Sequence, residues 1–200
     1  SESWRIALVG AGALGNAVLP LLFDVPIGKF TIIDGDRVEQ SNLERQPLFD
    51  ARDVGRSKSS VLAELAQRRM GHNTVIGYDG FLGTHNAHEL LRGHDLVLEG
   101  VDDLHAKTLI DRVCAEICIP LVSAAVHGTQ GQVILLHATG VNEALTRADL
   151  FEGPQGGEQD GCDMRHVPLS LLAEVAERMI ARLRDVLDAR SVTNGRLELL

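Results

Sequence analysis

Cysteines and long apolar runs are both scarce in this sequence. Its 200 residues include only Cys114, Cys118 and Cys162, an odd and sparse set that suits a reducing compartment better than a disulfide scaffold. No apolar stretch approaches the roughly 18 to 20 residues needed to span a bilayer, and no basic N-terminal region precedes a hydrophobic stretch. We therefore expect a soluble, cytoplasmic protein with no membrane association.

Basic residues are also in the minority. Lysine and arginine total 19 against 28 aspartates and glutamates, which gives a formal net charge of -9. This balance argues against a broad electrostatic grip on nucleic acid or anionic lipid, although a local basic pocket, for instance for a tRNA-linked group, stays open. The hydrophobic content of 44% suffices for one sizeable core, so we predict a single domain over residues 1–200.

Short apolar runs alternate with segments of helical period, which is typical of parallel strands joined by crossover helices. The predicted fold class is α/β: a Rossmann-like, mostly parallel sheet with helices on both faces. The expected strands are Arg5–Val9, Phe30–Asp34, Asn73–Gly77, Leu96–Glu99, Pro120–Ala125 and Gln132–His137. The expected helices between them are Leu14–Phe23, Lys58–Arg69, Asn86–Leu91 and Leu104–Ile117.

The alternating pattern stops at residue 138. The stretch FEGPQGGEQDG is rich in glycine and acidic residues, so we predict a mobile loop over residues 140–166. An amphipathic helix is expected over Pro168–Ala189, followed by a short strand over Arg196–Leu200.

A glycine-rich turn follows the first expected strand. Gly10, Gly12 and Gly15 form G-x-G-x-x-G between a strand and a helix, where glycines permit close backbone approach and a helix N-terminus offers N–H groups to a phosphate. Asp34 ends the second expected strand, where a carboxylate can accept hydrogen bonds from ribose hydroxyls. The pattern predicts a nucleotide site that suits NAD and ATP equally. The alternative is that the glycines only allow a close strand–helix crossing.

Polar residues beyond Asp34 favour ATP over NAD. Asn42 and Arg45 follow in SNLERQ, and Lys58, one of only three lysines, opens the next helix. A guanidinium matches phosphate oxygens bidentately and an ammonium is a compact point charge, so Arg45 and Lys58 could hold a polyphosphate. Each cation taken alone would more often be a solvated surface residue.

Two carboxylates follow the fourth expected strand. Asp102 and Asp103 lie where the carboxyl ends of parallel strands meet, which is where ligands bind in open α/β sheets. Carboxylates there could hold Mg²⁺ against phosphates, because Mg²⁺ prefers oxygen ligands. Asp103 could instead cap the helix that begins at Leu104.

Several motifs in this order resemble the ThiF/MoeB/HesA family, the adenylating core shared with ubiquitin-activating enzymes. The similarity runs from Ile6 to about His137 and includes GAGALG, IDGDRVEQSNLERQ, DVGRSKSS, VDDLHAK and IPLVSAAVHGTQGQV. Enzymes of this family bind ATP and Mg²⁺, attach AMP to the C-terminal carboxylate of a small ubiquitin-like protein and release pyrophosphate. The resemblance implies the same adenylation here, a homodimer, and a ubiquitin-like or sulfur-carrier protein as partner.

The resemblance also implies roles for individual residues. Asp102 would be the Mg²⁺-linked aspartate and would act in catalysis with Arg45 and Lys58. The implied nucleotide-binding residues are Gly10, Gly12, Gly15, Asp34, Asn42, Arg45, Gln46 and Lys58.

The sequence departs from the family pattern at three points. Only Ser1–Trp4 precede the first strand, whereas the family usually has an earlier helix whose arginine reaches the partner's ATP site. The paired C-x-x-C motifs of many members are absent, so we expect no zinc, and Cys114 and Cys118 are predicted to be buried in a helix. Finally, Lys107 stands where the family's D-N-x-x-x-R has arginine, which keeps the charge but loses the guanidinium fork.

Cys162 stands alone in the expected loop, near where thioester-forming members of the family place a nucleophile. Asp160 and Asp163 would raise the pKa of its thiol, while Arg165 and His166 would lower it. A nucleophile and an incidental loop thiol both stay open.

Three rivals to adenylation of a ubiquitin-like protein stay open as well. Relatives of this core activate a peptide or a tRNA-linked carboxylate. An NAD-dependent oxidoreductase would explain Gly10 to Asp34 but gives no role to Arg45, Lys58 and Asp102. A non-catalytic nucleotide-binding module would explain the short N-terminal segment.

Overall fold

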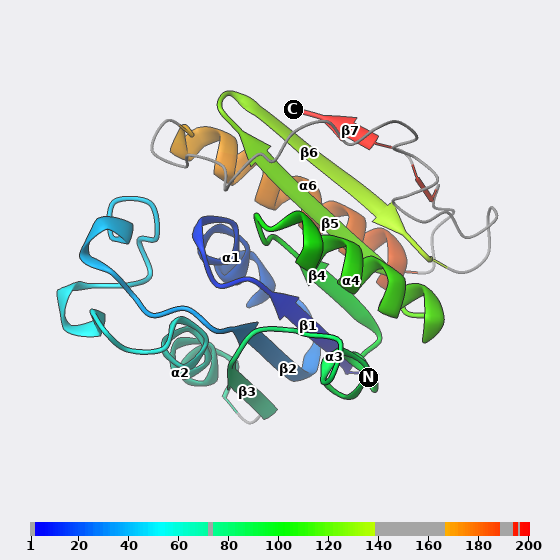
Figure 1. The fold of residues 1–200 in the computed structure, drawn as a ribbon, viewed down its shortest axis with the longest axis horizontal. Helices are drawn as coiled ribbons and strands as arrows, with labels where there is room; N and C mark the ends of the chain where they lie inside the picture. The colour runs from blue at the N-terminus through cyan, green and yellow to red at the C-terminus, as the bar shows by residue number, and fades with distance from the viewer. Residues whose placement is uncertain (1–2, 72–73, 139–166, 189–193, 196) are drawn as a thin grey trace.

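The computed structural model describes residues 3–71, 74–138, 167–188, 194–195 and 197–200. Within these residues, seven strands form one sheet in the order β3-β2-β1-β4-β5-β6-β7 (Figure 1). The strands are β1 Trp4–Val9, β2 Ile27–Asp34, β3 Thr74–Asp79, β4 Leu96–Glu99, β5 Leu121–His127, β6 Gln130–Leu136 and β7 Leu197–Leu199. Neighbours from β3 to β5 pair in parallel, while β6 and β7 join antiparallel. The predicted mostly parallel α/β sheet is confirmed.

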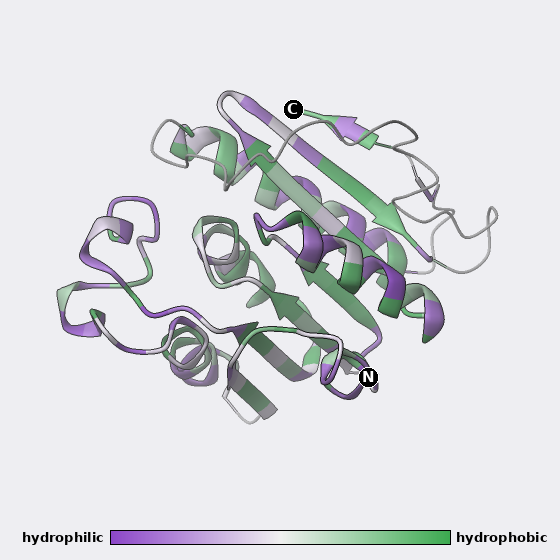
Figure 2. Ribbon diagram, viewed as in Figure 1, coloured by the Kyte–Doolittle hydropathy of each residue, from purple (hydrophilic) through white to green (hydrophobic). Residues whose placement is uncertain are grey.

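Helices cover both faces of the sheet. One face packs against α1 Ala13–Val18, α2 Lys58–Met70 and α6 Leu169–Leu187, and the other against α3 Ala87–Leu91 and α4 Leu104–Glu116. Strands covered on both sides are mostly apolar, which is why β1 continues as IALV after Arg5 and β4 begins as LVL before Glu99. Figure 2 shows this contrast, with green central strands and purple outward sides on α4. Among the described helices, none is both long and apolar enough to cross a membrane.

The first helix is shorter than predicted, and the connection between β5 and β6, which the sequence analysis left open, is a hairpin. The helix expected over Leu14–Phe23 is α1 followed by a 3-10 turn, η1, over Leu19–Leu22, because Pro20 lacks the N–H that would continue the α-helical ladder. β5 and β6 form a hairpin with only Gly128 and Thr129 between them, and Gly128 takes a positive φ of 58° that favours glycine.

The strand order places a crevice at the carboxyl ends of β1 and β4. From β1 the chain builds outward through β2 to β3, then returns to pair β4 with the other side of β1. Val9, the last residue of β1, lies in register with Ile33 of β2 and Glu99 of β4. The loops that follow these three strands therefore begin at the same edge of the sheet and separate there. Open α/β sheets bind ligands at this kind of position.

The segment between β2 and α2 folds as a separate excursion beside this crevice. It contains two short 3-10 turns, η2 Gln40–Asn42 and η3 Ala51–Asp53, and returns to α2 through an isolated bridge between Arg37 and Ser57. Figure 1 shows it standing out beyond α2 on the left of the view. This excursion carries the predicted SNLERQ residues to the rim of the crevice.

Candidate active site

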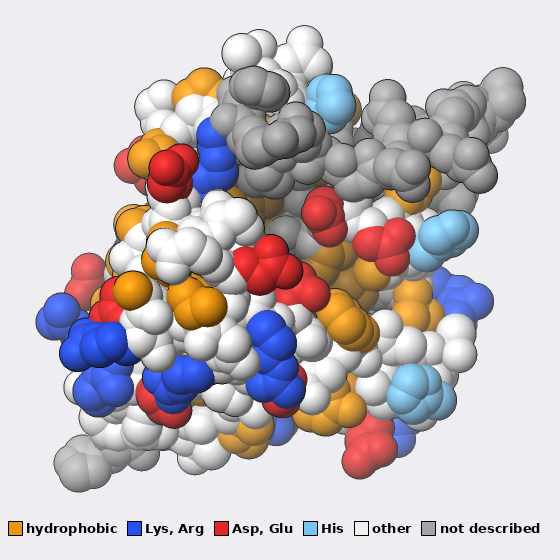
Figure 3. All heavy atoms as spheres, turned by 60° about the vertical axis from the view of Figure 1, so that its left-hand side comes forward, with side chains coloured by type: hydrophobic (Ala, Val, Ile, Leu, Met, Phe, Trp, Pro, Cys, Tyr) orange, Lys and Arg blue, Asp and Glu red, His pale blue; other side chains and the backbone are white. Residues whose placement is uncertain are grey.

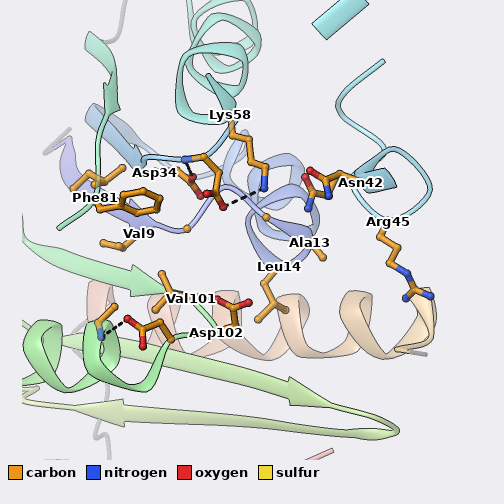
Figure 4. Close-up of a pocket in the computed structure, with 18 of the residues that line it drawn as sticks. Val9, Ala13, Leu14, Asp34, Asn42, Arg45, Lys58, Phe81, Val101 and Asp102 are labelled. Carbon is orange, nitrogen blue, oxygen red and sulfur yellow. Dashed lines mark hydrogen bonds and ion pairs between the residues drawn. The ribbon is translucent and has the colours of Figure 1, made fainter. Parts of the chain in front are cut away.

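A cavity of about 910 Å³ opens at the carboxyl ends of β1, β2 and β4. Its size falls within the roughly 300 to 1,000 Å³ of small-molecule sites. Every residue predicted to bind the nucleotide or metal lines it, except Gly15, which lies beneath the loop: the lining includes Gly10, Gly12, Asp34, Asn42, Arg45, Gln46, Lys58 and Asp102. Figure 4 shows the labelled side chains of Asp34, Asn42, Arg45, Lys58 and Asp102, which come from β2, the excursion, α2 and the turn after β4.

The glycine loop forms the floor, and its glycines serve different purposes. Gly10 takes a φ of 101°, which favours glycine, and a Cβ at Gly15 would lie 2.2 Å from the Gly10 carbonyl oxygen. Both positions therefore require glycine because the loop and the helix pack closely together. Among the described residues, a Cβ at Gly12 would meet only the Gln46 amide nitrogen, at 3.8 Å. Gly12 is therefore the position where the missing side chain leaves room for a ligand.

Asn16 ties the glycine loop to the excursion. This buried side chain donates from its amide nitrogen to the carbonyls of Ala11 and Gly12, at 3.1 and 3.0 Å, and accepts from the Leu48 N–H at 3.0 Å. It thereby bridges the floor and the segment that follows Gln46. Sequence reasoning missed Asn16, because a polar residue in a short helix carries no signal of burial.

Asp34 is half-buried and already shapes the loop. One carboxylate oxygen accepts from the Ala11 N–H at 2.6 Å and the other from the Asp36 N–H at 2.7 Å. Burial raises the pKa of Asp34, while these two N–H groups and the Lys58 ammonium oppose that rise. A carboxylate offers about four lone-pair positions, so Asp34 can still accept hydrogen bonds from ribose hydroxyls.

Lys58 places a cation inside the cavity. It is the first residue of α2, which Ser57 caps, and only 7% of its surface is exposed. Its Nζ lies 3.4 Å from an oxygen of Asp36, an acidic neighbour that the sequence prediction did not include. Asn42 stands on the same side of the cavity in Figure 4, and its side-chain oxygen accepts from the Glu39 N–H at 3.2 Å. Its amide nitrogen would thus be the group that meets a phosphate.

The structure does not bring the Arg45 guanidinium to Lys58. Arg45 lines the cavity but points toward α6, where it donates to the Val167 carbonyl at 2.5 Å (Figure 4). A joint grip on the phosphates would require this side chain to turn from Val167. Gln46 is 8% exposed, and its Oε1 makes no hydrogen bond in the described part of the chain. Because buried polar atoms are normally paired, this oxygen suits a ligand hydroxyl or a metal-bound water.

The two aspartates after β4 have different roles. Asp103 caps α4, accepting from the N–H groups of His105 and Ala106 at 3.1 and 3.2 Å, as the structural alternative predicted. Asp102 is exposed and points into the cavity (Figure 4). Of the pair, Asp102 is therefore the carboxylate available for a metal.

Lys107 does not offer its charge to the phosphates as the sequence suggested. It is buried, and its Nζ lies 2.7 Å from Glu99 Oε1 and donates to the Ala124 carbonyl at 2.7 Å. Glu99 ends β4 with 0% exposure. The Glu99 carboxylate neutralises Lys107, a pairing that spacing along the chain could not reveal.

The opposite end of the cavity is apolar. Val9, Val101 and Phe81 stand there in Figure 4, away from Lys58 and Arg45. Phe81 is 66% exposed, and its ring covers Gly35 so closely that a Cβ at that position would lie 2.5 Å from it. A flat apolar wall of this kind suits a purine base. Phe81 was not predicted, because one aromatic residue in a loop has no distinguishing pattern.

Acidic side chains gather around the hollowed face of the molecule in Figure 3. Among the described residues that line the cavity, carboxylates outnumber cations: Asp34, Asp36, Glu44, Asp102 and Asp103 stand against Arg45, Lys58 and Lys107. Because Lys107 is already paired, a polyphosphate would meet a wall with excess negative charge. A divalent cation beside Asp102 would offset that repulsion, so the donor set fits a nucleotide bound together with Mg²⁺.

The cysteines behave differently from one another. Cys114 is buried as predicted, and burial raises the pKa of its thiol well above the usual range. The prediction that Cys118 is also buried is wrong: α4 ends at Glu116, and Cys118 lies beyond it, exposed, with a φ of 55°. No group of three or more metal-ligating side chains occurs in the described residues. Cys162 and the loop expected over residues 140–166 lie outside the described residues.

The open sheet, the switch of direction between β1 and β4 and the glycine loop define a doubly wound nucleotide-binding fold. The ThiF family model matches residues 1–197, and the chain belongs to the ThiF family. The solved structure of E. coli MccB with SeMet MccA shares the fold, with a TM-score of 0.82 and 16% identity over 98% of this chain and 60% of that one. The structure of SeMet PaaA gives a TM-score of 0.77 at 19% identity, also over 98% of this chain and 60% of the other.

Curated relatives are similar at the sequence level. The chain is 34% identical over 136 residues to "Adenylyltransferase and sulfurtransferase UBA4" of Saccharomyces cerevisiae, covering 68% of this chain and 31% of that protein. It is 36% identical over 132 residues to "Sulfur carrier protein adenylyltransferase" of Thermus thermophilus, covering 66% and 49%. The chain thus spans between about a third and a half of the length of these relatives.

Proposed function

We propose that this chain binds ATP with Mg²⁺ and transfers AMP to a carboxylate, releasing pyrophosphate. The observation that carries the proposal is one cavity with an apolar end at Phe81, a ribose-type carboxylate at Asp34, and the Lys58 cation and Asp102 carboxylate beyond them. An NAD-dependent oxidoreductase would use the first two features and give Lys58 and Asp102 no role. The names of the relatives, which are adenylyltransferases, support the same reaction.

The reaction needs electrostatics and positioning more than proton transfer. A carboxylate is already an anion at neutral pH, so attack on the α-phosphorus requires no general base but requires two anions to be held together. Lys58 would offset phosphate charge, and Asp102 would hold Mg²⁺. Bound there, the metal would stabilise charge that develops on the leaving pyrophosphate. Arg45 would join them once its guanidinium leaves the Val167 carbonyl.

We propose the C-terminal carboxylate of a small ubiquitin-like or sulfur-carrier protein as the acceptor. The Thermus thermophilus relative is named for a sulfur carrier, and that match is sequence-level similarity rather than shared fold alone. A peptide carboxylate is the alternative. Its support is the solved MccB–MccA structure, which is similar to this chain in fold alone. A homodimer and a cytoplasmic location stay predictions of the family resemblance and of the composition.

The deciding experiment is pyrophosphate exchange into ATP. We expect label from pyrophosphate to appear in ATP when the protein, Mg²⁺ and a sulfur-carrier protein are combined. A carrier whose C-terminal carboxyl group is amidated serves as the matched control and should give no exchange, because it has no C-terminal carboxylate to attack the α-phosphorus. Exchange with a short peptide but not with a carrier would select the peptide alternative. A complete lack of exchange, whichever carboxylate is supplied, would favour a non-catalytic nucleotide-binding module.

Thermal melting tests the nucleotide separately. Because Lys58 and Asp102 suit a polyphosphate with a metal, ATP with Mg²⁺ should raise the melting temperature more than NAD does at equal concentration. A ligand at a hundred times its Kd stabilises the native state by about 2.7 kcal/mol, so the difference is measurable. Equal or stronger protection by NAD would contradict the ATP assignment.

A further inference from the structure

The buried Glu99 carboxylate sits directly behind the turn that carries Asp102. Its Oε1 accepts from the Val101 N–H at 2.7 Å and lies 2.7 Å from the Lys107 ammonium, while its Oε2 accepts from the Ser123 hydroxyl. One carboxylate thus joins β4, the following turn, α4 and β5. Its side chain is 1% exposed and that of Lys107 is 6% exposed, so neither makes this contact through solvent.

The turn is held at three successive points around Asp102. The Gly100 N–H donates to the Val9 carbonyl at 3.0 Å, the Val101 N–H donates to Glu99, and the Asp103 side chain caps α4. The Asp102 side chain points into the cavity between the last two of these points. A carboxylate on a turn fixed on both sides loses little freedom when it binds a metal.

Lys107 makes this arrangement stable. A single carboxylate buried in the sheet would be strongly disfavoured, but the Lys107 ammonium offsets its charge and also donates to the Ala124 carbonyl. The pair is neutral overall. It therefore adds no cation to the phosphate end of the cavity, although Lys107 lines it.

We propose that Glu99, paired with Lys107, is a positioning residue that holds the Val101 N–H and so fixes Asp102 for metal binding. This inference rests on the proposed ATP and Mg²⁺ site and assigns a role to two residues that do not contact the phosphates. Outer groups that orient a metal ligand typically change metal affinity by about 10- to 100-fold when removed.

The test replaces the pair without leaving a buried charge. The double variant Glu99→Met/Lys107→Met exchanges a buried ion pair for apolar side chains of similar size, which proteins often tolerate. We expect it to fold but to melt below the wild type, because the Val101 N–H, the Ser123 hydroxyl and the Ala124 carbonyl lose these partners. The Val101 amide should exchange with deuterium at least about tenfold faster in the nucleotide-free protein, because its acceptor is gone. Mn²⁺, measured by electron paramagnetic resonance with a non-hydrolysable ATP analogue, should bind at least about tenfold more weakly.

Ser123→Ala is the matched control. It removes the contact to Oε2 and keeps the one between Oε1 and Val101, so Mn²⁺ affinity should match the wild type. A double variant that is folded and binds Mn²⁺ as tightly as the wild type would overturn the inference, as would equal weakening in Ser123→Ala. Wild-type protein that binds no Mn²⁺ with the analogue would overturn both this inference and the proposed function. The wild type could also bind Mn²⁺ in a way that depends on Glu99 and yet give no pyrophosphate exchange. That result would support the inference and contradict only the proposed adenylation.

Discussion

Asp102→Asn is expected to lower kcat for pyrophosphate exchange by about a hundredfold or more. The substitution keeps the size of the side chain but removes the negative charge that would orient Mg²⁺ on the phosphates. As charge moves onto the leaving pyrophosphate, the interaction with the metal strengthens, so its loss raises the barrier more than it weakens substrate binding. Steady-state exchange kinetics at saturating ATP and acceptor measure the effect.

Two other carboxylates calibrate this result. Asp103→Asn should leave kcat near the wild-type value, because asparagine caps a helix about as well as aspartate and Asp103 caps α4. Asp34→Ala should mainly raise the KM for ATP, since ribose does not change during the reaction. It also removes the acceptor of the Ala11 N–H, so the melting temperature must be measured alongside. Normal exchange by folded Asp102→Asn would falsify its catalytic role.

Gly15→Ala should destabilise the protein severely, whatever its substrate. A methyl group there would lie 2.2 Å from the Gly10 carbonyl oxygen, a backbone atom that cannot rotate away. Strain of this kind costs about 3 kcal/mol or more. In a chain of this length, that corresponds to a fall in melting temperature of about 6 to 12 °C. Thermal melting followed by circular dichroism measures it without any ligand.

Gly12→Ala is the matched substitution in the same loop, and it tests the space for a ligand rather than packing. Within the part of the chain that the structure describes, its Cβ would meet only the Gln46 amide nitrogen, at 3.8 Å, so the melting temperature should stay within about 3 °C of the wild type. The methyl group would occupy the approach of a phosphate, so we expect ATP to bind at least about tenfold more weakly by calorimetry. Unchanged ATP affinity in Gly12→Ala would place the phosphates elsewhere, and an undisturbed melting temperature in Gly15→Ala would contradict the packing argument.

The sequence predicted those parts of the fold that follow from local periodicity. β1 and β4 were recognised from their apolar runs, because strands buried on two faces have few polar residues. α6 was recognised from its amphipathic pattern, because a helix buried along one stripe repeats apolar residues with helical period. The glycine loop could also be placed, because its motif joins a strand to a helix. The β5–β6 hairpin was missed, although Gly128 in a two-residue connection was an available signal.

Parts of the candidate site depend on tertiary contacts that residue order does not encode. The pairing of Lys107 with Glu99 and the bridge from Asn16 to Leu48 join residues from separate elements. The direction of Arg45 is similar, because only the packed structure shows its guanidinium at the Val167 carbonyl rather than beside Lys58. Motif spacing thus identified most of the polar residues that line the cavity, but missed Asp36 and did not show which side chains are already paired.

The Asn16 amide has a consequence for how binding energy is used. Its three hydrogen bonds connect the loop after β1 with a segment 32 residues further along the chain, so the two sides of the phosphate end cannot separate without leaving buried polar groups unpaired. Much of the ordering entropy of these loops is therefore lost when the protein folds, before any ligand arrives. A nucleotide that enters this region would bind to loops that are already ordered. Less of its interaction energy would then be needed to order the backbone than in a site whose loops are free before binding.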